Sequence, residues 1–547
     1  MIRIHNLKLP IDFTEAELRQ SVIRKLRLKA DDLGTVTLEK KSLDARKKED
    51  ILYICTVLAV VRNEKSILQR AAHGHSSEIE AFSPAPYILP QHGDRQLQHR
   101  PVIIGTGPAG LFAGLTLAEA GFCPVLLERG DEARRRLSRV TEFWDGGSLD
   151  PECNVQFGEG GAGTFSDGKL NTMVRDPLHH SRHVLETFVR FGAPEEILYL
   201  QKPHIGTDLL VSIVTALREE IVRLGGEVRF RTRFDRILRE DGHLAAVGMT
   251  QEGKQEILPA EVVILAPGHS ARDTFTLLAE EQIAMERKAF AIGLRIEHSQ
   301  ELIGRSQYGE AFRQLPPADY KLTHQTAAGR GVYSFCMCPG GFVVNASSEP
   351  GMLAVNGMSN YRRDSGNANS ALVVTVTPAD FGEEGGVLAG VQFQRKYERA
   401  AFQAAGGKIP LQLSGDFRRG VISGGFGTLQ PSMKGSYGFA NLRDCLPGFV
   451  SDTIAEGIAC FDKKIRGFGA EDAILSGVET RTSSPVRILR DPASLEAVSL
   501  PGLYPCGEGA GFAGGITSAA MDGILTAEKI IADFDLPRCT KEAVHHG

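Results

Sequence analysis

The sequence predicts an α/β fold built around a parallel β-sheet, and three features along the chain support this. Residues 101–105 form a short apolar run that leads into a glycine-rich turn, a helical stretch and a second apolar run at 124–128. This order of strand, turn, helix and strand is that of a βαβ unit, whose two strands are parallel. A third apolar run at 503–505 leads into another glycine-rich turn and a helix from about Ser518. Both regions are therefore expected to contribute to one core.

A small α+β domain of the ferredoxin-like kind is expected to precede this core. Its first helix is predicted at 14–25, because Thr14 and Glu17 have the spacing of a capping box. The strands predicted around it are 2–7, 34–40 and 50–61. The predicted division of the whole chain is 1–95 for this N-terminal domain, 96–284 for the first part of a Rossmann-type core, 285–490 for an inserted α+β cap domain, and 491–547 for the second part of the core.

The middle of the first core part is predicted to return to the main sheet. A helix is expected at 208–224 because apolar residues recur there at helical spacing. The strands expected after it are 227–230, 234–239, 244–250 and 262–265.

The bulk composition is that of an ordinary globular protein. Of the 547 residues, 42% are apolar and 24% are charged, and the formal net charge is −5. This balance predicts neither a nucleic-acid partner nor an acidic membrane surface as partner. The nine cysteines are scattered and odd in number, which favours a reducing compartment over a disulfide framework. No signal peptide or bilayer-spanning run is recognised, so a cytoplasmic location is expected.

The turn after residues 101–105 has the glycine spacing of a dinucleotide-binding motif. Gly105 permits the tight turn, Gly107 lets a pyrophosphate approach the backbone, and Gly110 lets the helix pack closely on the sheet. Pro108 suits the first helical turn, where its missing N–H costs nothing. The free N–H groups of that turn, including that of Ala109, favour a phosphate.

The second strand of this unit ends in an acid, as such motifs require. Glu128 follows Gly110 by 18 residues, where a carboxylate that binds the adenosine ribose is expected. A carboxylate there disfavours a 2′-phosphate and hence NADP. Glu128 and the adjacent Arg129 are therefore predicted to bind the cofactor. This first unit does not distinguish FAD from NAD.

The C-terminal motif at 502–523 favours FAD. In flavoproteins of the glutathione-reductase superfamily, which this motif resembles, a similar strand, acid, glycine and helix pass along the dinucleotide. The acid there accepts from the ribitol and the helix N-terminus points at the flavin ring. By this resemblance Gly507, Glu508, Gly515 and Ile516 are expected to contact FAD.

Two further glycine-containing segments complete the predicted cofactor site. The polar loop at 155–172 offers backbone N–H groups and short polar side chains. The strand at 262–265 ends in Pro267-Gly268, at the edge of the sheet where ligands bind. The residues predicted to bind FAD here are Gly161, Gly163, Thr164, Lys169 and Gly268.

Taken together, these motifs resemble the bacterial family of uncharacterised FAD-dependent dehydrogenases, which is related more distantly to the fumarate-reductase-like flavoproteins. The resemblance covers nearly the whole chain. It implies non-covalent FAD on a Rossmann core with a cap and a small N-terminal domain, and it names no substrate. The strings that carry it, besides the C-terminal motif, lie at 291–298, 332–341, 356–374 and 478–491.

Candidate catalytic groups lie in the cap. Cys336 and Cys338 share one face of a regular strand, so they are interpreted either as a redox dithiol or as two small buried side chains. Arg481 is interpreted as a group that clamps a carboxylate or orients the flavin edge, or else as half of a surface ion pair with Glu479 or Asp491.

Three other polar clusters are given structural interpretations. His179, His180 and His183 suggest a solvated helix face, and no metal site is predicted. The segment with Asn356, Tyr361, Arg362 and Arg363 is interpreted either as cap residues that face the flavin or as a solvated turn, and the turn is favoured. The tail histidines, His545 and His546, are expected to be disordered.

The function predicted from these features is that of a FAD-dependent oxidoreductase acting on a small organic substrate. NAD(P)H is kept as a transient electron donor, since no second dinucleotide fingerprint is evident. The alternatives are a non-catalytic FAD-binding scaffold and an RNA-associated flavoprotein. The RNA alternative rests only on the basic run at 40–48, which acidic residues interrupt. The oligomeric state is not predicted.

Overall fold

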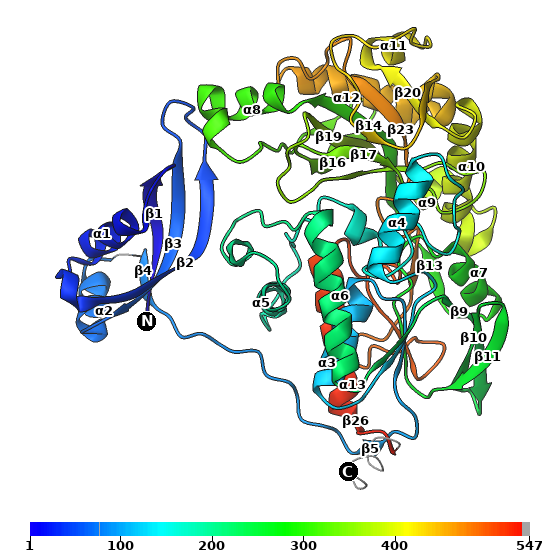
Figure 1. The fold of residues 1–547 in the computed structure, drawn as a ribbon, viewed down its shortest axis with the longest axis horizontal. Helices are drawn as coiled ribbons and strands as arrows, with labels where there is room; N and C mark the ends of the chain where they lie inside the picture. The colour runs from blue at the N-terminus through cyan, green and yellow to red at the C-terminus, as the bar shows by residue number, and fades with distance from the viewer. Residues whose placement is uncertain (76, 539–547) are drawn as a thin grey trace.

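The computed structural model describes residues 1–75 and 77–538. The two tail histidines whose disorder was expected lie outside these residues. A small N-terminal unit, blue in Figure 1, is joined by an extended segment to a larger body that contains the core and the cap.

The N-terminal unit is a four-stranded antiparallel sheet with two helices, in the βαββαβ order of ferredoxin-like folds. The predicted capping box is confirmed, because Thr14 and Glu17 bond reciprocally at the start of the first helix. The helix α2 and the strand β4 were not predicted. The elements are β1 (Ile2–Pro10), α1 (Glu15–Leu26), β2 (Leu33–Asp44), β3 (Leu52–Val61), α2 (Glu64–His73) and β4 (Ile79–Ala81), and the sheet order is β2-β3-β1-β4.

The predicted Rossmann-type α/β core is confirmed as a five-stranded parallel sheet. Three long helices pack beside it (Figure 1), which are α3 (Pro108–Glu119), α6 (Thr207–Arg223) and α13 (Ile516–Asp533). The sheet order is β25 (Leu503–Pro505), β12 (Val263–Leu265), β6 (Val102–Ile104), β7 (Val125–Leu127) and β8 (Glu227–Arg229).

The expectation that the strands after 232 all join this sheet is wrong. The strands β9 (Thr232–Glu240), β10 (His243–Gln251) and β11 (Lys254–Pro259) form a separate antiparallel sheet. The turns at Asp241-Gly242 and Glu252-Gly253 have positive φ at both residues. Such two-residue turns join antiparallel neighbours, whereas a parallel partner needs a long crossover.

The cap is a seven-stranded sheet covered by helices. Its order is β15 (Thr323–Gln325), β16 (Gly331–Cys338), β19 (Asn367–Val376), β14 (Phe290–Ser299), β23 (Ile474–Glu479), β20 (Ile409–Leu413) and β22 (Tyr437–Phe439). The helices of this part are α8 (Gln300–Tyr308), α9 (Pro378–Phe381), α10 (Ala389–Ala404), α11 (Ser414–Arg419) and α12 (Gly448–Asp462).

Shorter elements connect the cap to the core. β13 (Met285–Arg287) pairs with β24 (Val486–Ile488) where the chain leaves the core and where it returns. In the cap, β17 (Phe342–Asn345), β18 (Val355–Met358) and β21 (Met433–Lys434) form a three-stranded sheet, and in the core β5 (Arg95–Gln96) pairs with β26 (Phe534–Asp535). The core part also contains α4 (Ala133–Trp144), α5 (His180–Arg190), α7 (Arg272–Glu280) and the 3₁₀ turn η2 (Ala162–Phe165).

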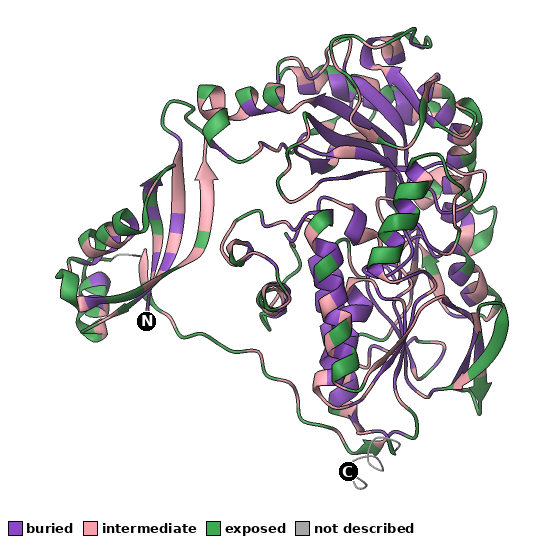
Figure 2. Cartoon of the chain, in the orientation of Figure 1, coloured by how far each residue is buried: buried purple, intermediate pink, exposed green. Residues whose placement is uncertain are grey.

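Burial shows why these elements form. Ten of the twelve residues of α3 are buried, so this helix lies inside the body, as its apolar sequence requires. Figure 2 shows α3 and the neighbouring core as largely buried, while α1 and α2 keep exposed outer faces. Among residues 1–75 and 77–538, no helix is both long and apolar enough to cross a membrane. The eight cysteines in that part of the chain are free thiols.

Candidate dinucleotide site

The glycine turn between β6 and α3 is built so that only glycine fits. Gly105 has a φ of 95°, and a Cβ there would lie 2.4 Å from the carbonyl oxygen of Ala266. A Cβ on Gly110 would lie 1.9 Å from the carbonyl oxygen of Gly105. The turn and the start of the helix are therefore packed too tightly for any side chain at these two positions.

Three helix starts from distant parts of the sequence converge beside this turn. They are those of α3, η2 and α13. A Cβ on Gly161 would lie 3.0 Å from the Cα of Gly107, and one on Gly163 would lie 3.0 Å from Cγ1 of Ile516. The structure thus brings together residues that were predicted separately from three motifs.

Three of the predicted or neighbouring glycines border open space. A Cβ on Gly268, Gly514 or Gly515 would meet nothing within 4 Å, so the backbone there borders open space. The hydroxyl of Thr164 is buried and, within the described chain, has no hydrogen-bond partner. Helix N-termini carry unpaired N–H groups and a partial positive charge, which suit phosphate oxygens. These residues can therefore hold a cofactor of the FAD type.

Glu128 has a structural role that the sequence did not reveal. Its carboxylate is almost fully buried and accepts four hydrogen bonds from protein donors. These come from N and Oγ1 of Thr106, at 3.0 and 2.7 Å, and from N of Gly130 and Gly158, at 2.9 and 3.0 Å. Glu128 therefore ties the glycine turn to the loop at 158, and its contact with a ribose stays a prediction.

Arg129 is paired within the protein. Its Nε lies 2.8 Å from Glu152, and its Nη1 lies 2.9 Å from Asp273. The guanidinium also stacks over Phe157, 4.2 Å from the ring centre. These contacts leave its predicted role at the cofactor without geometric support.

Lys169 links the cofactor loop to the cap. Its Nζ donates to Asp167 at 2.7 Å and to the carbonyl of Met337 on β16. Asp167 also accepts from Ser359 at 2.6 Å and from Arg363 Nε at 2.9 Å. Burial alone would raise the pKa of Asp167, but the two cations lower it to about 2. The interpretation of Arg363 as part of a solvated turn is therefore wrong.

The C-terminal motif is held by a pair that the sequence did not indicate. Gly507, with a φ of 76°, donates its N–H to Asp522 at 2.7 Å, and Asp522 pairs with Arg490 at 2.6 Å. Glu508 follows Gly507 in the chain, and burial raises the pKa of its carboxyl to about 7, although the positive charge of Lys288 acts to lower it. Glu508 can thus change its protonation state near neutral pH. No local pattern marks Arg490 and Asp522 as partners, and only the fold brings them together.

The two cap cysteines do not share one face as predicted. The register of β16 against β19 shifts between Phe335 and Cys338, and Cys336 has a φ of 40°. This β-bulge interrupts the alternation, so that Cys336 is exposed while Cys338 is fully buried. Arg295 Nη2 holds the bulge through the carbonyl of Cys336 at 2.6 Å. Desolvation by the surrounding protein raises the pKa of the buried Cys338 thiol.

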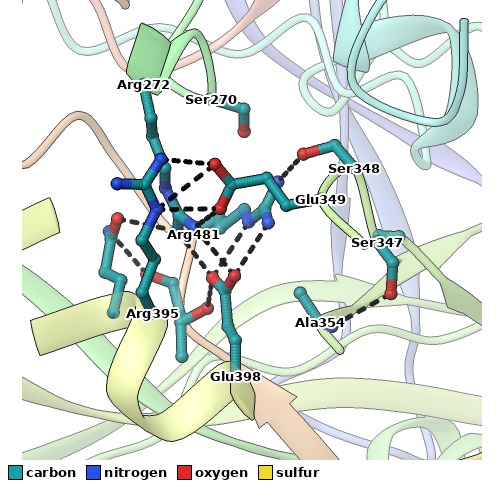
Figure 3. Close-up of polar contacts among 12 residues, drawn as sticks. Ser270, Arg272, Ser347, Ser348, Glu349, Ala354, Arg395, Glu398 and Arg481 are labelled. Carbon is teal, nitrogen blue, oxygen red and sulfur yellow. Dashed lines mark hydrogen bonds and ion pairs between the residues drawn. The ribbon is translucent and has the colours of Figure 1, made fainter. Parts of the chain in front are cut away.

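Arg481 lies in a buried ionic cluster between core and cap (Figure 3). Its Nη2 lies 2.8 Å from Glu398 of α10, and Arg272 Nη2 of α7 lies 2.6 Å from the same carboxylate. The predicted partners of Arg481 are wrong, because Glu479 pairs instead with Arg295 at 3.3 Å. Arg481 Nη1 also donates to Oγ of Ser348 at 2.5 Å. The guanidinium is therefore bound by protein groups and is not free to clamp a substrate.

The histidines on α5 were also misjudged. His180 is buried and lies 3.0 Å from Glu528, and His183 stacks on Tyr87 with ring centres 3.8 Å apart. The solvated helix face is therefore wrong for these two. Within the described residues, no three metal-binding side chains gather into a possible metal site.

The sheet, the glycine turn and the converging helix starts define the class of dinucleotide-binding α/β proteins. A protein from Clostridium beijerinckii that carries no functional name is 49% identical over 542 residues, which are 98% of this chain and 100% of that protein. Residues 289–482 match the family described as "FAD-dependent protein, C-terminal domain-like", and residues 1–60 match a domain of unknown function, DUF8436. The chain therefore belongs to a family of uncharacterised FAD-dependent proteins.

Solved structures offer only distant likenesses. A geranylgeranyl bacteriochlorophyll reductase-like protein from Thermoplasma acidophilum is 11% identical, with 82% of this chain and 80% of that chain covered and a TM-score of 0.34. A 3-ketosteroid-Δ4-(5α)-dehydrogenase from Rhodococcus jostii is 12% identical, with 81% and 99% covered and a TM-score of 0.34. Likeness at this level supports no conclusion about activity.

Proposed function

We propose that this chain is a FAD-dependent oxidoreductase that acts on a small organic substrate at the junction of core and cap. The observation that carries the proposal is the convergence of the α3, η2 and α13 helix starts, with open space at Gly515, the N-cap of α13. The match of residues 289–482 to a FAD-dependent family supports the choice of cofactor. Bound FAD would supply hydride or two-electron transfer.

The chain's own residues would bind and orient the cofactor. The N–H groups at the starts of α3 and η2 suit the pyrophosphate, and the start of α13 suits the flavin end, where negative charge collects on reduction. Glu508 lies in the motif that precedes α13, where the positive charge of Lys288 favours its ionised form. With a pKa of about 7, Glu508 can take up or release a proton there at neutral pH.

We propose Cys336 as a cap side chain that contacts the substrate, because the bulge in β16 exposes it. A redox pair with Cys338 is not proposed, since Cys338 is fully buried on the other side of the bulge. Alkylation of the folded protein should therefore modify Cys336 faster than Cys338.

NAD(P)H is proposed only as a visiting electron donor, and a cytoplasmic location is proposed from the free cysteines. No RNA partner is proposed. The basic run at 40–48 lies on β2 and in the exposed turn after it, where Arg46 pairs with Asp44 at 2.7 Å.

The experiment that tests catalysis is an anaerobic titration of the FAD-loaded protein. The ~450 nm band of bound flavin should bleach rapidly with NADH, NADPH or a member of a metabolite panel. A chain that binds FAD but is reduced by none of these would instead be a scaffold. A matched variant, Cys336→Ser, should still bind FAD and should lose substrate turnover more than the initial bleaching by NAD(P)H.

A further inference from the structure

A fully buried arginine on α4 directs its hydrogen bonds to one loop. Arg134 and Arg135 are exposed on this helix, whereas Arg136 is 0% exposed. The guanidinium of Arg136 has no ion-pair partner among the described residues and donates to backbone carbonyls. These are the carbonyls of Asn154 (3.0 Å), Val155 (3.0 Å), Gly158 (3.1 Å), Glu159 (2.7 Å) and Gly161 (2.8 Å).

The loop at 154–161 is closed around this cation. A Cβ on Gly158, which has a φ of 119°, would lie 2.4 Å from Cδ of Arg136. Only glycine at this position therefore leaves room for the arginine side chain. The ring of Phe165, at the end of η2, covers the guanidinium at 4.8 Å. The arginine therefore fills the inside of the loop.

The N–H groups of the loop are directed elsewhere. Gly158 donates to Glu128 at 3.0 Å, and Gly160 donates to the carbonyl of Thr106, in the glycine turn, at 2.9 Å. The loop is thereby fixed to the turn before α3 on one side and to Arg136 on the other. The next element along the chain is η2, whose first residues adjoin the starts of α3 and α13.

We propose that Arg136 is a positioning residue for the cofactor site: it folds the 154–161 loop so that the start of η2 completes the phosphate-binding junction. This rests on the proposed function. Arg136 has no carboxylate partner among the described residues, so the dipoles of the carbonyl groups stabilise its charge. The positive charge also makes the electrostatic potential at the loop favourable for an anion. Burial lowers the pKa of Arg136 to about 10, so it remains charged at neutral pH.

The test compares Arg136→Met and Arg136→Lys with the matched control Arg135→Met on the exposed side of the same helix. Hydrogen exchange is measured on the FAD-free protein, and FAD affinity is measured by flavin fluorescence. In Arg136→Met, amide exchange at 154–165 should accelerate, and FAD should bind at least about tenfold more weakly, since several charge-assisted hydrogen bonds are lost. Arg136→Lys keeps the charge but not the five N–H donors, so its exchange rate and its FAD affinity should lie between those of the unsubstituted chain and of Arg136→Met.

The exchange pattern separates the possible outcomes. Unchanged exchange at 154–165 in Arg136→Met, or an equal effect of Arg135→Met, would overturn the proposal. If Arg136→Met does not fold, Arg136→Lys decides: acceleration confined to 154–165 supports the proposal, and uniform acceleration contradicts it. If the unsubstituted chain binds no FAD while the loop responds to Arg136, the proposed function fails and the role of Arg136 in the loop stands.

Discussion

At the scale of single residues, the molecule depends on charges that are buried and paired. Glu398 is the clearest case, because it is fully buried between Arg272 and Arg481 and also accepts from Thr480 at 2.6 Å. Burial would raise its pKa, but the two guanidiniums hold it well below the usual range. The pair Arg272 and Glu398 also joins a core helix to a cap helix, so the cluster couples the two parts.

Among the described residues, replacing this carboxylate should leave Arg481 without an ion-pair partner and Arg272 with Glu349 alone, at 2.8 Å. We expect Glu398→Gln to lower the free energy of unfolding by about 3–5 kcal/mol, the usual cost of breaking a buried ion pair from one side. Chemical denaturation measures this. The control Glu383→Gln removes an exposed carboxylate that lies 3.7 Å from Arg287, and it should change stability by less than about 1 kcal/mol. A small effect of Glu398→Gln would contradict the importance of the cluster.

Glu297 on β14 should make stability depend on pH. Burial raises its pKa to about 7, although Asn367 at 3.0 Å and the N–H of Ser432 at 2.8 Å bond to its carboxylate. Because this folded-state pKa lies above the unfolded value near 4.5, the native state binds more protons between these two pH values. Stability from this group is therefore lost as the pH rises from about 4.5 to about 7.

The variant Glu297→Gln removes this titration and keeps an acceptor oxygen. Relative to the unsubstituted chain, its free energy of unfolding should rise by on the order of 3 kcal/mol between pH 4.5 and pH 8. Urea denaturation at several pH values measures the difference, in which the other titrating groups cancel. A difference that stays constant with pH would show that Glu297 titrates normally.

At the scale of elements, short-range patterns predicted what is local. The βαβ unit and the first helix of the N-terminal unit follow from glycine spacing and from Thr14 with Glu17, which lie within a few residues of one another. The β-bulge at Cys336 and the partners of Arg481 could not be predicted, because they depend on strands and helices far apart in sequence. The separate β9–β11 sheet could have been found from its two X-Gly turns.

The capping box gives a prediction at this scale. Thr14→Ala removes the side chain that accepts from the N–H of Glu17, so the N-terminal unit should lose about 1 kcal/mol of stability. Hydrogen exchange of the backbone amides of residues 2–26, measured as the temperature rises, reports on the unfolding of this unit. Gln20→Ala, at an exposed position inside the same helix, should not destabilise it. Equal losses in both variants would show that the cap contributes nothing.

At the scale of the whole molecule, the site belongs to no single segment. The loop at 154–165 meets the turn at 105–110 through the bond from the N–H of Gly160 to the carbonyl of Thr106. The start of α13 comes beside them because β25, at the end of the chain, pairs with β12 next to β6. The sequence predicted each of these motifs and their common ligand. It did not predict the internal supports, Arg136 and Asp522, because a buried polar residue has no local pattern that distinguishes it from an exposed one.

The extended segment that joins the N-terminal unit to the body alternates between exposed and half-buried residues (Figure 2), and the two parts also touch directly. The N–H of Lys41 on β2 donates to the carbonyl of Tyr199 at 2.6 Å, and the N–H of Gln201 donates to the carbonyl of Lys41 at 2.9 Å. A three-residue segment of the body thus continues the N-terminal sheet. This contact gives the N-terminal unit a defined place beside the body.

The central claim is that the junction of helix starts holds FAD, and a binding measurement on one glycine tests it most directly. A Cβ on Gly107 would meet only the Cα of Gly161, at 3.8 Å, so Gly107→Ala should fold normally while a methyl group enters the proposed phosphate site. Gly448→Ala, at another helix start with open space around it, is the control. We predict that the unsubstituted chain and Gly448→Ala bind one FAD per chain and that Gly107→Ala binds it at least about tenfold more weakly. Folded, unsubstituted protein that binds no FAD, or a Gly107→Ala variant that binds it equally well, would contradict the account.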